Sequence, residues 1–467
     1  MPDGAGKKTI LLVASLASFL TPFMGSSINI ALPAIGAELG ADAVLLTWVP
    51  TAYLLATAIC IVPFGRLADM YGRTLIFSAG IVVYTVGSFF SGIAMSVEVL
   101  VAARIVQGVG AAMIYGTGVA LITSAFPKEE RGWAIGYNVA AVYLGLSLGP
   151  ILGGVLTQQF GWRSVFYFNV PLGLVIIAVA LTRLGSDRKS GDGERFDVIG
   201  SIIVACMLFC LMYGFSTLPS GTGIGLVLLG ILFAAGFVAW ERRFPYPVLE
   251  ISLFSHNRTF AYSNAAALIN YSATFAVGFL LSLYLQYIKG FDPQAAGLVL
   301  IAQPVVQTLL SPAAGRFSDR LEPRIVASAG MALTTAGLVL LAFLTEQTEL
   351  SWIIGAQIVL GAGFALFSSP NTNAVMTSVH PRQYGVASGT VASMRLVGMM
   401  FSMGVVMLTF SVLIGRVTIT PDYYAPFVSS VRIAFAIFAL LCAGGVYASV
   451  QRGNIRVPRE SGDNPKD

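Results

Sequence analysis

Long apolar stretches alternate with short polar breaks over almost the whole chain. A helix needs about 20 mostly apolar residues to cross the hydrocarbon core of a bilayer. Stretches of that order recur fourteen times, each bounded to within several residues. We therefore predict fourteen membrane-spanning helices, at approximately 9–35, 45–68, 75–95, 99–125, 132–158, 163–183, 198–217, 221–240, 260–288, 294–316, 325–345, 351–379, 384–414 and 428–450.

The composition agrees with a chain that lives in lipid. Hydrophobic residues make up 56% of the 467 residues and charged residues only 10%, against roughly 25% charged residues in a soluble domain. Backbone groups in lipid must be satisfied internally, so only helices and closed barrels span a membrane, and barrels show short alternating segments instead of long apolar runs. The fold class we predict is an all-α polytopic membrane protein.

Basic residues gather on one side of the predicted membrane. The turns after odd-numbered spans hold few cations, namely Arg163, Lys289 and Arg416, whereas the alternate loops and both chain ends carry most of the 27 Lys and Arg. Cytoplasmic loops carry the excess of Lys and Arg in membrane proteins. We therefore expect a multi-pass protein of the cytoplasmic membrane with both termini in the cytoplasm. The net charge of +5 follows from this topology and does not indicate nucleic-acid binding.

The sequence shows no constellation for catalysis, metal binding or nucleotide binding. All four cysteines fall within predicted spans, and the two histidines, His256 and His380, fall in predicted cytoplasmic loops. The phosphate-binding pattern GxxxxGK[ST] is missing. We expect no enzyme activity, no catalytic residue, no cofactor and no metal site.

A charged turn and its echo indicate an internal repeat. Residues 65–73 read Gly-Arg-Leu-Ala-Asp-Met-Tyr-Gly-Arg, and residues 315–320 read Gly-Arg-Phe-Ser-Asp-Arg about 250 positions later. Residues 384–389 echo residues 131–136 at nearly the same offset. Equal offsets indicate two six-span halves of parallel topology. Repeated membrane halves are typical of secondary transporters, whose site lies near the midplane between the halves.

The repeat divides the chain into six spans, a two-span insert and six spans. We predict an N-terminal six-helix bundle at 1–184 and a C-terminal six-helix bundle at 260–451. Between them, 185–259 would hold cytoplasmic linkers and two inserted helices, and 452–467 would be a polar cytoplasmic tail.

Arg104 stands about six residues inside the fourth span. An arginine at membrane depth is costly and is by default a functional candidate, although it can also extend to the interface. Gln107 and Gly108 share its helical face, and a small residue there lets a partner helix or a ligand come close. Both readings of Arg104 stay open at this point.

Gly145, Gly149 and Gly153 repeat every four residues along the fifth span, and Pro150 lies among them. The glycines line one side of the helix and permit close backbone contact, while the proline removes a hydrogen bond and favours a bend. This pattern indicates either a tight helix seam or a hinge.

Together these motifs resemble the major facilitator superfamily, and specifically its fourteen-span branch of multidrug:proton antiporters. Residues 65–73 match the loop motif G-x-L-A-D-x-x-G-R, residues 104–112 match R-x-x-Q-G-x-G-A-A, and residues 145–154 match the antiporter motif G-x-x-x-G-P-x-x-G-G. The resemblance covers nearly the whole chain. It implies the major facilitator fold and secondary export by alternating access, with proton antiport as the family expectation.

The resemblance also implies a cytoplasmic gate, a charge network that latches the two halves in the outward-facing state. Its residues here would be Gly65, Asp69, Gly72, Arg73 and Asp319. The alternative is a solvated tight turn without a gating role. The second copy has Glu322 and Pro323 where the first has Gly72 and Arg73, so we expect an asymmetric latch.

One departure from the family bears on the substrate. The first span of this branch usually ends in N-x-A-L-P and carries an acidic residue five positions before that asparagine. The asparagine here is Asn29, and the residue five positions before it is Met24. No acidic residue falls in the middle of a predicted span, whereas Arg104 and Arg395 do. Fixed positive charge disfavours organic dications, so neutral or weakly anionic amphiphiles become the expected cargo.

Polar groups at mid-depth are the candidates for the substrate cavity, because pockets are mostly apolar with a few placed polar groups. For each of them a hydrogen bond between helices is an equally good reading. The candidates are Tyr53, Asn138, Tyr143, Asn270, Tyr271, Gln303, Gln307 and Arg395.

We expect a monomeric exporter of small amphiphilic molecules, embedded in the bilayer and coupled to protons. The alternatives are an uncoupled facilitator or an exporter of neutral or anionic lipid-like metabolites. A non-transporting sensor or scaffold is a more remote alternative, because the predicted outer loops are short.

Overall fold

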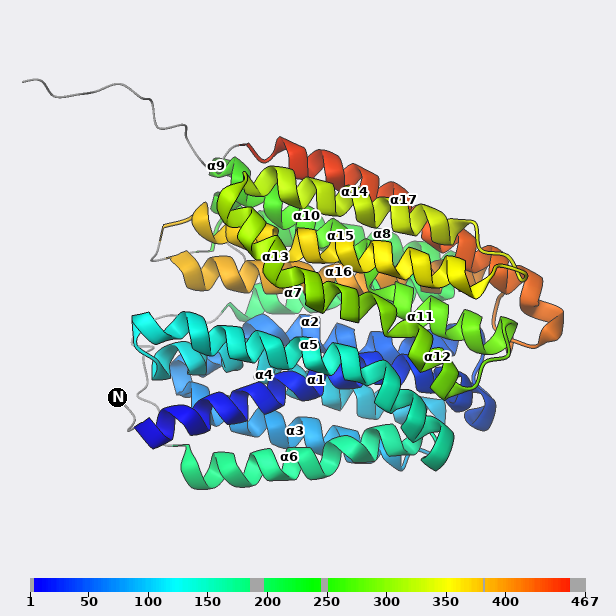
Figure 1. Ribbon diagram of the computed structural model, residues 1–467, viewed down its shortest axis with the longest axis horizontal. Coiled ribbons are helices and arrows are strands. Elements are labelled where there is room, and N and C mark those ends of the chain that lie inside the picture. The colour runs from blue at the N-terminus through cyan, green and yellow to red at the C-terminus, as the bar shows by residue number, and fades with distance from the viewer. Residues whose placement is uncertain (1–3, 185–196, 245–250, 381–382, 454–467) are drawn as a thin grey trace, which may run out of the picture.

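The protein is helical throughout the residues that the structure describes, which are 4–184, 197–244, 251–380 and 383–453. Figure 1 shows the computed structural model, in which long helices run side by side along a common direction. Fourteen segments of the described chain are long and apolar enough to cross a membrane. The predicted all-α polytopic fold is thereby confirmed.

The helices follow the order of six spans, two spans and six spans. The first six are α1 (Gly4–Leu39), α2 (Ala43–Tyr71), α3 (Arg73–Gly92), α4 (Val97–Ala125), α5 (Lys128–Phe160) and α6 (Arg163–Arg183). The insert consists of α7 (Val198–Thr217) and α8 (Gly221–Glu241). After the short α9 (Ile251–His256) come α10 (Arg258–Thr274), α11 (Ala276–Leu283) and η1 (Tyr284–Ile288) as one span, then α12 (Pro293–Leu300) with α13 (Ala302–Arg320), α14 (Pro323–Ala342), α15 (Leu350–Thr377), α16 (Tyr384–Leu413) and α17 (Tyr424–Gln451).

The boundaries 1–184, 185–259, 260–451 and 452–467 stay predictions. Linker residues 185–196 and 245–250 and tail residues 454–467 lie outside the described residues.

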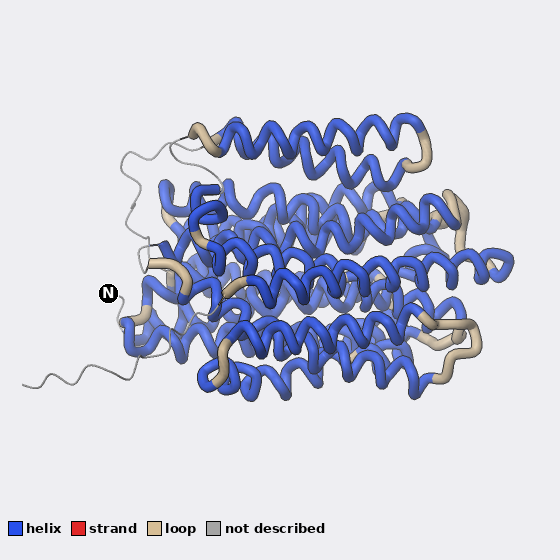
Figure 2. The backbone as a smooth tube through the Cα atoms, turned by 90° about the horizontal axis from the view of Figure 1, so that it is seen from above, coloured by secondary structure: helices blue, strands red, loops and turns tan. Residues whose placement is uncertain are grey.

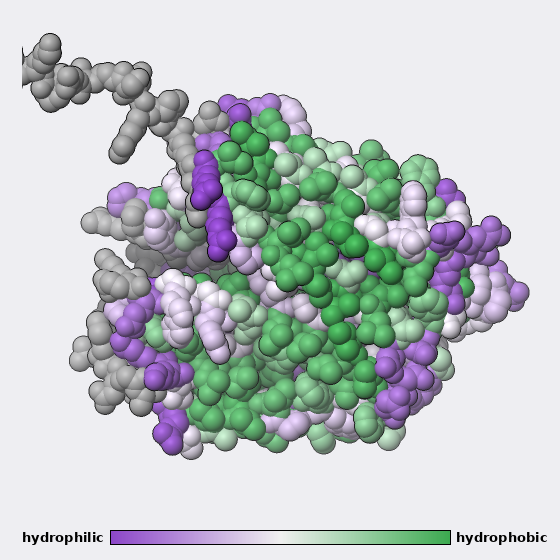
Figure 3. Space-filling view, in the orientation of Figure 1, coloured by the Kyte–Doolittle hydropathy of each residue, from purple (hydrophilic) through white to green (hydrophobic). Residues whose placement is uncertain are grey.

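A broad apolar band covers one face of the molecule. Figure 3 shows hydrophobic side chains over its middle and hydrophilic ones gathered toward its two ends. Leu232 and Leu440, both within membrane spans that do not line the central cavity at these positions, are 67% and 74% exposed, which suits contact with lipid tails and not with water. We call the end at which α1 begins and α17 ends the basic end, because Arg66, Arg73 and Arg242 lie there; the other is the opposite end.

Two helical groups form the body of the molecule. In Figure 1 α1 to α6 occupy the lower part, α10 and α13 to α17 occupy the upper part, and α12 lies at the level of α5. Within the lower group α1 packs along α5, and a Cβ added to Gly145 would lie 2.5 Å from the Phe19 carbonyl oxygen. One added to Gly153 would lie 2.8 Å from Ser27 Cα, and the Ser27 hydroxyl donates to the Gly149 carbonyl oxygen at 2.9 Å. The glycine pattern of α5 therefore forms a tight seam with α1.

The inserted helices form a peripheral hairpin. Figure 2 shows a helix pair set apart at the edge of the bundle. α7 packs against α8 and also touches α2 of the first group and α16 of the second. Leu208 and Met212 of α7 join Leu396 and Met400 of α16 in one apolar cluster. The insert thus covers one junction between the two groups.

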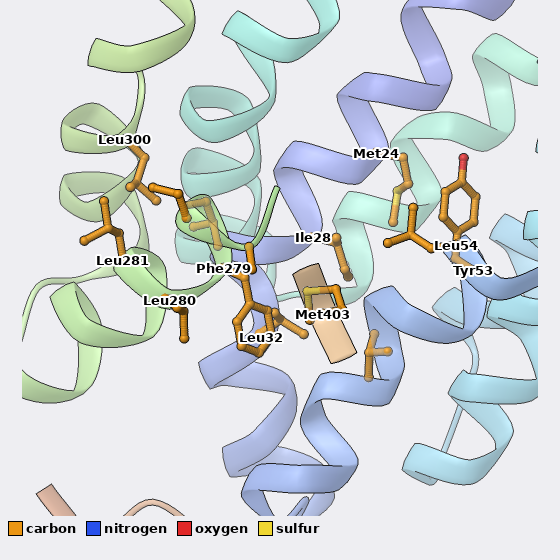
Figure 4. Packing of buried hydrophobic residues seen from close by; sticks show 14 of the residues in the cluster. Met24, Ile28, Leu32, Tyr53, Leu54, Phe279, Leu280, Leu281, Leu300 and Met403 are labelled. Atoms are coloured by element: carbon orange, nitrogen blue, oxygen red, sulfur yellow. The ribbon is translucent and has the colours of Figure 1, made fainter. Parts of the chain in front are cut away.

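An apolar core joins the two groups. Leu32 of α1, Phe279 of α11 and Met403 of α16 are fully buried and belong to one cluster, and Figure 4 shows them close together. Packing of this kind is the main attraction between helices in lipid, because the lipid itself is apolar.

The α1–α5 seam makes a stability prediction. Gly145→Ala places a methyl group against the Phe19 carbonyl oxygen, and such overpacking costs about 1–3 kcal/mol. We expect a lower melting temperature for the purified protein in detergent. Gly136→Ala on the same helix is the control, because a Cβ there meets nothing within 4 Å. An unchanged melting temperature for Gly145→Ala would contradict the tight seam.

Candidate functional site

A large cavity lies between the two helical groups. Its volume is about 3200 Å³, with α1, α2, α4 and α5 on one side and α10, α13, α15 and α16 on the other. Asp69, Arg73, Arg131 and Glu241 line it at the basic end. No loop residue described at the opposite end lines it. The cavity therefore opens at the basic end and ends inside the molecule.

Close helix contacts seal the opposite end. The Ser282 hydroxyl on α11 donates to the Asn29 carbonyl oxygen on α1 at 2.7 Å. Where α5 meets α12, a Cβ on Gly154 would lie 2.6 Å from the Pro293 carbonyl oxygen. Both contacts join the first helical group to the second, so the two groups touch at this end while they part at the other.

Arg104 lies inside the first helical group and is only 1% exposed. Its Nε donates to the Val49 carbonyl oxygen at 3.1 Å, and NH1 donates to Gln107 Oε1. Gln107 Nε2 in turn donates to the Ser88 hydroxyl at 2.7 Å, and the guanidinium lies over the Tyr53 ring at 4.3 Å from its centroid. Arg104 does not extend to the membrane interface, because these groups take up its charge within the protein.

Gly108 brings α2 against α4. A Cβ at this position would lie 2.9 Å from Ala56 Cβ, and the Thr57 hydroxyl donates to the Gly108 carbonyl oxygen at 3.1 Å. The small residue is thus needed for helix contact, which fixes the wall of the cavity beside Arg104.

The charged turn joins α2 to α3 at the mouth of the cavity. Gly72 has φ of 113°, a conformation that favours glycine, and Arg73 pairs with Asp69 at 2.9 Å across it. Both partners belong to the first helical group. A Cβ on Gly65 would meet nothing within 4 Å in this conformation. Asp319 belongs to α13, but its side chain lies outside the described residues.

The cavity candidates from the sequence mostly share one surface. Asn270 is the exception, because it is fully buried and does not line the cavity. Its neighbour Tyr271 does line it, since successive residues of a helix point about 100° apart. Seven candidates line the cavity: Tyr53, Asn138, Tyr143, Tyr271, Gln303, Gln307 and Arg395.

Met24 is not part of the cavity wall. It is fully buried in the first helical group, where the Asn169 amide on α6 donates to its sulfur at 3.3 Å. An acid at position 24 would therefore face Asn169 in this conformation. The charge of the cavity in this conformation therefore depends on its own lining residues, among which Met24 is not found.

Sequence reasoning missed several residues of this region. Gly297 packs on the Pro150 carbonyl group and completes the seal between α12 and α5, but a single glycine in a span carries no recognisable pattern. Tyr115 of α4 lines the cavity and is 37% exposed. A tyrosine in the middle of a long apolar span is a polar group at mid-depth, and this could have identified Tyr115 as a cavity candidate.

The Major Facilitator Superfamily model matches residues 14–240 and 264–466. The chain belongs to the major facilitator superfamily. As a member of this superfamily it is a transport protein and not an enzyme. A riboflavin transporter, RibZ of Clostridioides difficile (strain 630), is 30% identical over 392 residues, which cover 83% of this chain and 85% of RibZ.

Another relative within the superfamily is the multidrug resistance protein Stp of Mycobacterium tuberculosis (strain CDC 1551 / Oshkosh). It is 31% identical over 394 residues, covering 83% of this chain and 73% of Stp. The crystal structure of a bacterial homologue of the human lysosomal transporter Spinster, inward-facing and unoccupied, has a TM-score of 0.71 at 15% identity. It covers 97% of this chain and 98% of that one, and supports the fold alone.

The Arg104 network makes a second prediction for this transporter. Gln107→Leu removes the acceptor of the buried guanidinium, and loss of a hydrogen bond to a charged group costs about 1.5–3 kcal/mol. We expect a clearly lower melting temperature in detergent. Gln303→Leu, at a cavity-lining glutamine, is the matched control and should change the melting temperature little. Equal decreases for the two substitutions would contradict a stabilising role of the Arg104 network.

Proposed function

We propose that this chain is a secondary active exporter of small amphiphilic molecules that works by alternating access with proton antiport. The observation that carries the proposal is the 3200 Å³ cavity between the two helical groups, open at one end and sealed at the other. A cavity of this kind would expose one binding site to one side of the membrane at a time. During transport the sealed end would have to open and the open end would have to close.

We further propose that the basic end faces the cytoplasm, as the excess of Lys and Arg suggests. The structure would then represent an inward-facing state. One chain holds the whole cavity, so a monomer would suffice for transport.

The turn at residues 65–73 would act as the cytoplasmic gate in this scheme. When the mouth closes, Asp69 would exchange part of its contact with Arg73 for groups of the second half, Asp319 among the residues brought near. The open space beside Gly65 would then be filled by the approaching helices. We expect this latch to be asymmetric, because the second copy of the motif has Glu322 and Pro323 where the first has Gly72 and Arg73.

The gate makes a third prediction. Asp69→Asn removes the carboxylate that pairs with Arg73, so we expect loss of most protection in a drug-sensitive host that expresses the protein. Asp422→Asn, an exposed acid near the start of α17 at the opposite end, is the control and should protect like the unchanged protein. Equal protection by both variants, at equal expression, would argue against the gate.

Proton coupling is tested in proteoliposomes. Among the described residues the acids that line the cavity are Asp69 and Glu241, and a carboxylate is the usual proton carrier in such a path. We expect a pH gradient to drive uptake of an amphiphilic drug against its concentration gradient. Transport that equilibrates the drug at the same rate with and without the gradient would leave the uncoupled facilitator as the function.

A further inference from the structure

Arg395 differs from every other charged group of the deep cavity. It lies about three turns into α16, faces the cavity and is exposed to it. Its described neighbour is the Tyr271 ring, whose centroid lies 5.6 Å from the guanidinium carbon. The ion pairs of the described residues do not include it. A guanidinium at membrane depth without a carboxylate is costly unless a ligand supplies the negative charge.

Arg104, the other arginine at membrane depth, has hydrogen-bond partners for most of its guanidinium. Arg104 donates to the Val49 carbonyl oxygen and to Gln107 within the first helical group, so its hydrogen-bonding capacity is largely used. Arg395 has Tyr271 of the second helical group as its described partner, and its guanidinium lies at the surface of the cavity. The planar fork of donors in a guanidinium matches a carboxylate with two parallel hydrogen bonds.

The lining acids lie too far along the cavity to neutralise Arg395. Asp69 is near the basic end of α2 and pairs with Arg73, and Glu241 is the last residue of α8. Arg395 lies about 16 Å deeper along its helix than the start of α16. The deep half of the cavity therefore has a net positive charge.

The surroundings of Arg395 add an apolar wall and open polar positions. The Tyr271 and Phe364 rings meet edge to face with centroids 5.4 Å apart, and both line the cavity. Tyr143 on the other wall and Gln303 on the same side as Arg395 are partly exposed and also line the cavity. A ligand that filled this space would have an anionic group, a flat apolar body and a few polar atoms.

We propose that Arg395 is the anion-binding residue of the substrate site, and that the substrate is an amphiphilic organic monoanion whose carboxylate pairs with Arg395 while its ring system lies against Tyr271 and Phe364. The inference rests on the proposed export function and narrows its substrate class. An inside-negative potential would favour release of a monoanion to the outside by about tenfold for each 59 mV, and any protons exchanged inward would add to this driving force.

The binding test uses the purified full-length protein and a panel of aromatic carboxylates. Each is paired with its neutral amide and with an amine of the same ring system, and thermal stabilisation is measured over a range of concentrations. The carboxylates should bind at least tenfold more tightly than their amides. Arg395→Gln should abolish that preference, and Arg395→Lys should keep part of it. Arg416→Gln, at an exposed arginine of the opposite end, should leave it unchanged.

The outcomes separate the two proposals. Equal or tighter binding of amides or amines, or a carboxylate preference that survives Arg395→Gln in a variant with an unchanged melting temperature, overturns the role of Arg395 and leaves an exporter of other amphiphiles. Binding of no member of any charge class contradicts the exporter itself. Because lipid phosphate carries the same charge, phosphatidylglycerol is tested alongside; stabilisation by this lipid and not by the carboxylates also overturns the proposal.

A flux measurement gives a second readout. Proteoliposomes are loaded with the tightest-binding carboxylate, and valinomycin with a potassium gradient sets the potential at equal pH on both sides. Efflux of the carboxylate should accelerate when the interior is negative and slow when it is positive. Its neutral amide partner should respond less steeply, because only the exchanged protons then carry charge. A carboxylate flux that ignores the sign of the potential would contradict transport of the anion.

Discussion

The cost of placing a guanidinium inside a membrane governs this structure more than any other single interaction. Arg104 meets it with partners from its own helical group, a backbone carbonyl, an amide and an aromatic face. These contacts tie α4 to α2 and, through Gln107 and Ser88, to α3. The charge of Arg395 is compensated less fully, because its described surroundings are the Tyr271 ring and the open cavity. The first arginine builds a rigid wall, and the second leaves a binding capacity open within it.

The sequence predicted the spans, the repeat and the superfamily because each depends on local pattern. Apolar length sets the spans. The spacing of the α5 glycines places them on one side of the helix and predicted either a seam or a hinge, and the structure shows the seam. The orientation of single polar residues was harder to predict. A membrane helix is apolar on almost all sides, so its hydrophobic pattern does not reveal which face looks inward. Asn270 and Tyr271 are neighbours in sequence, and only the second reaches the cavity.

The contacts between the two halves were also not predictable from local sequence pattern. Gly154 of α5 meets Pro293, and Gly297 of α12 meets Pro150. Each residue pair joins segments that are far apart in sequence, and nothing local distinguishes these glycines from the others in the chain. Met24 shows a related difficulty. The family resemblance associates this position with the transport path, but its side chain contacts Asn169 within the first helical group and does not line the cavity.

The two ends of the molecule are held by different forces, and this difference matters for movement. The opposite end is sealed by backbone approach at glycines and by the Ser282 hydrogen bond, interactions of short range that fail once the helices separate. The mouth at the basic end carries charges such as Asp69 and Arg73, which attract over a longer distance and tolerate water. In the proposed transport cycle, a ligand bound at mid-depth would touch both helical groups and draw the mouth together. Closure would then strain the glycine contacts at the far end, because rigid helices cannot close at both ends of a filled cavity.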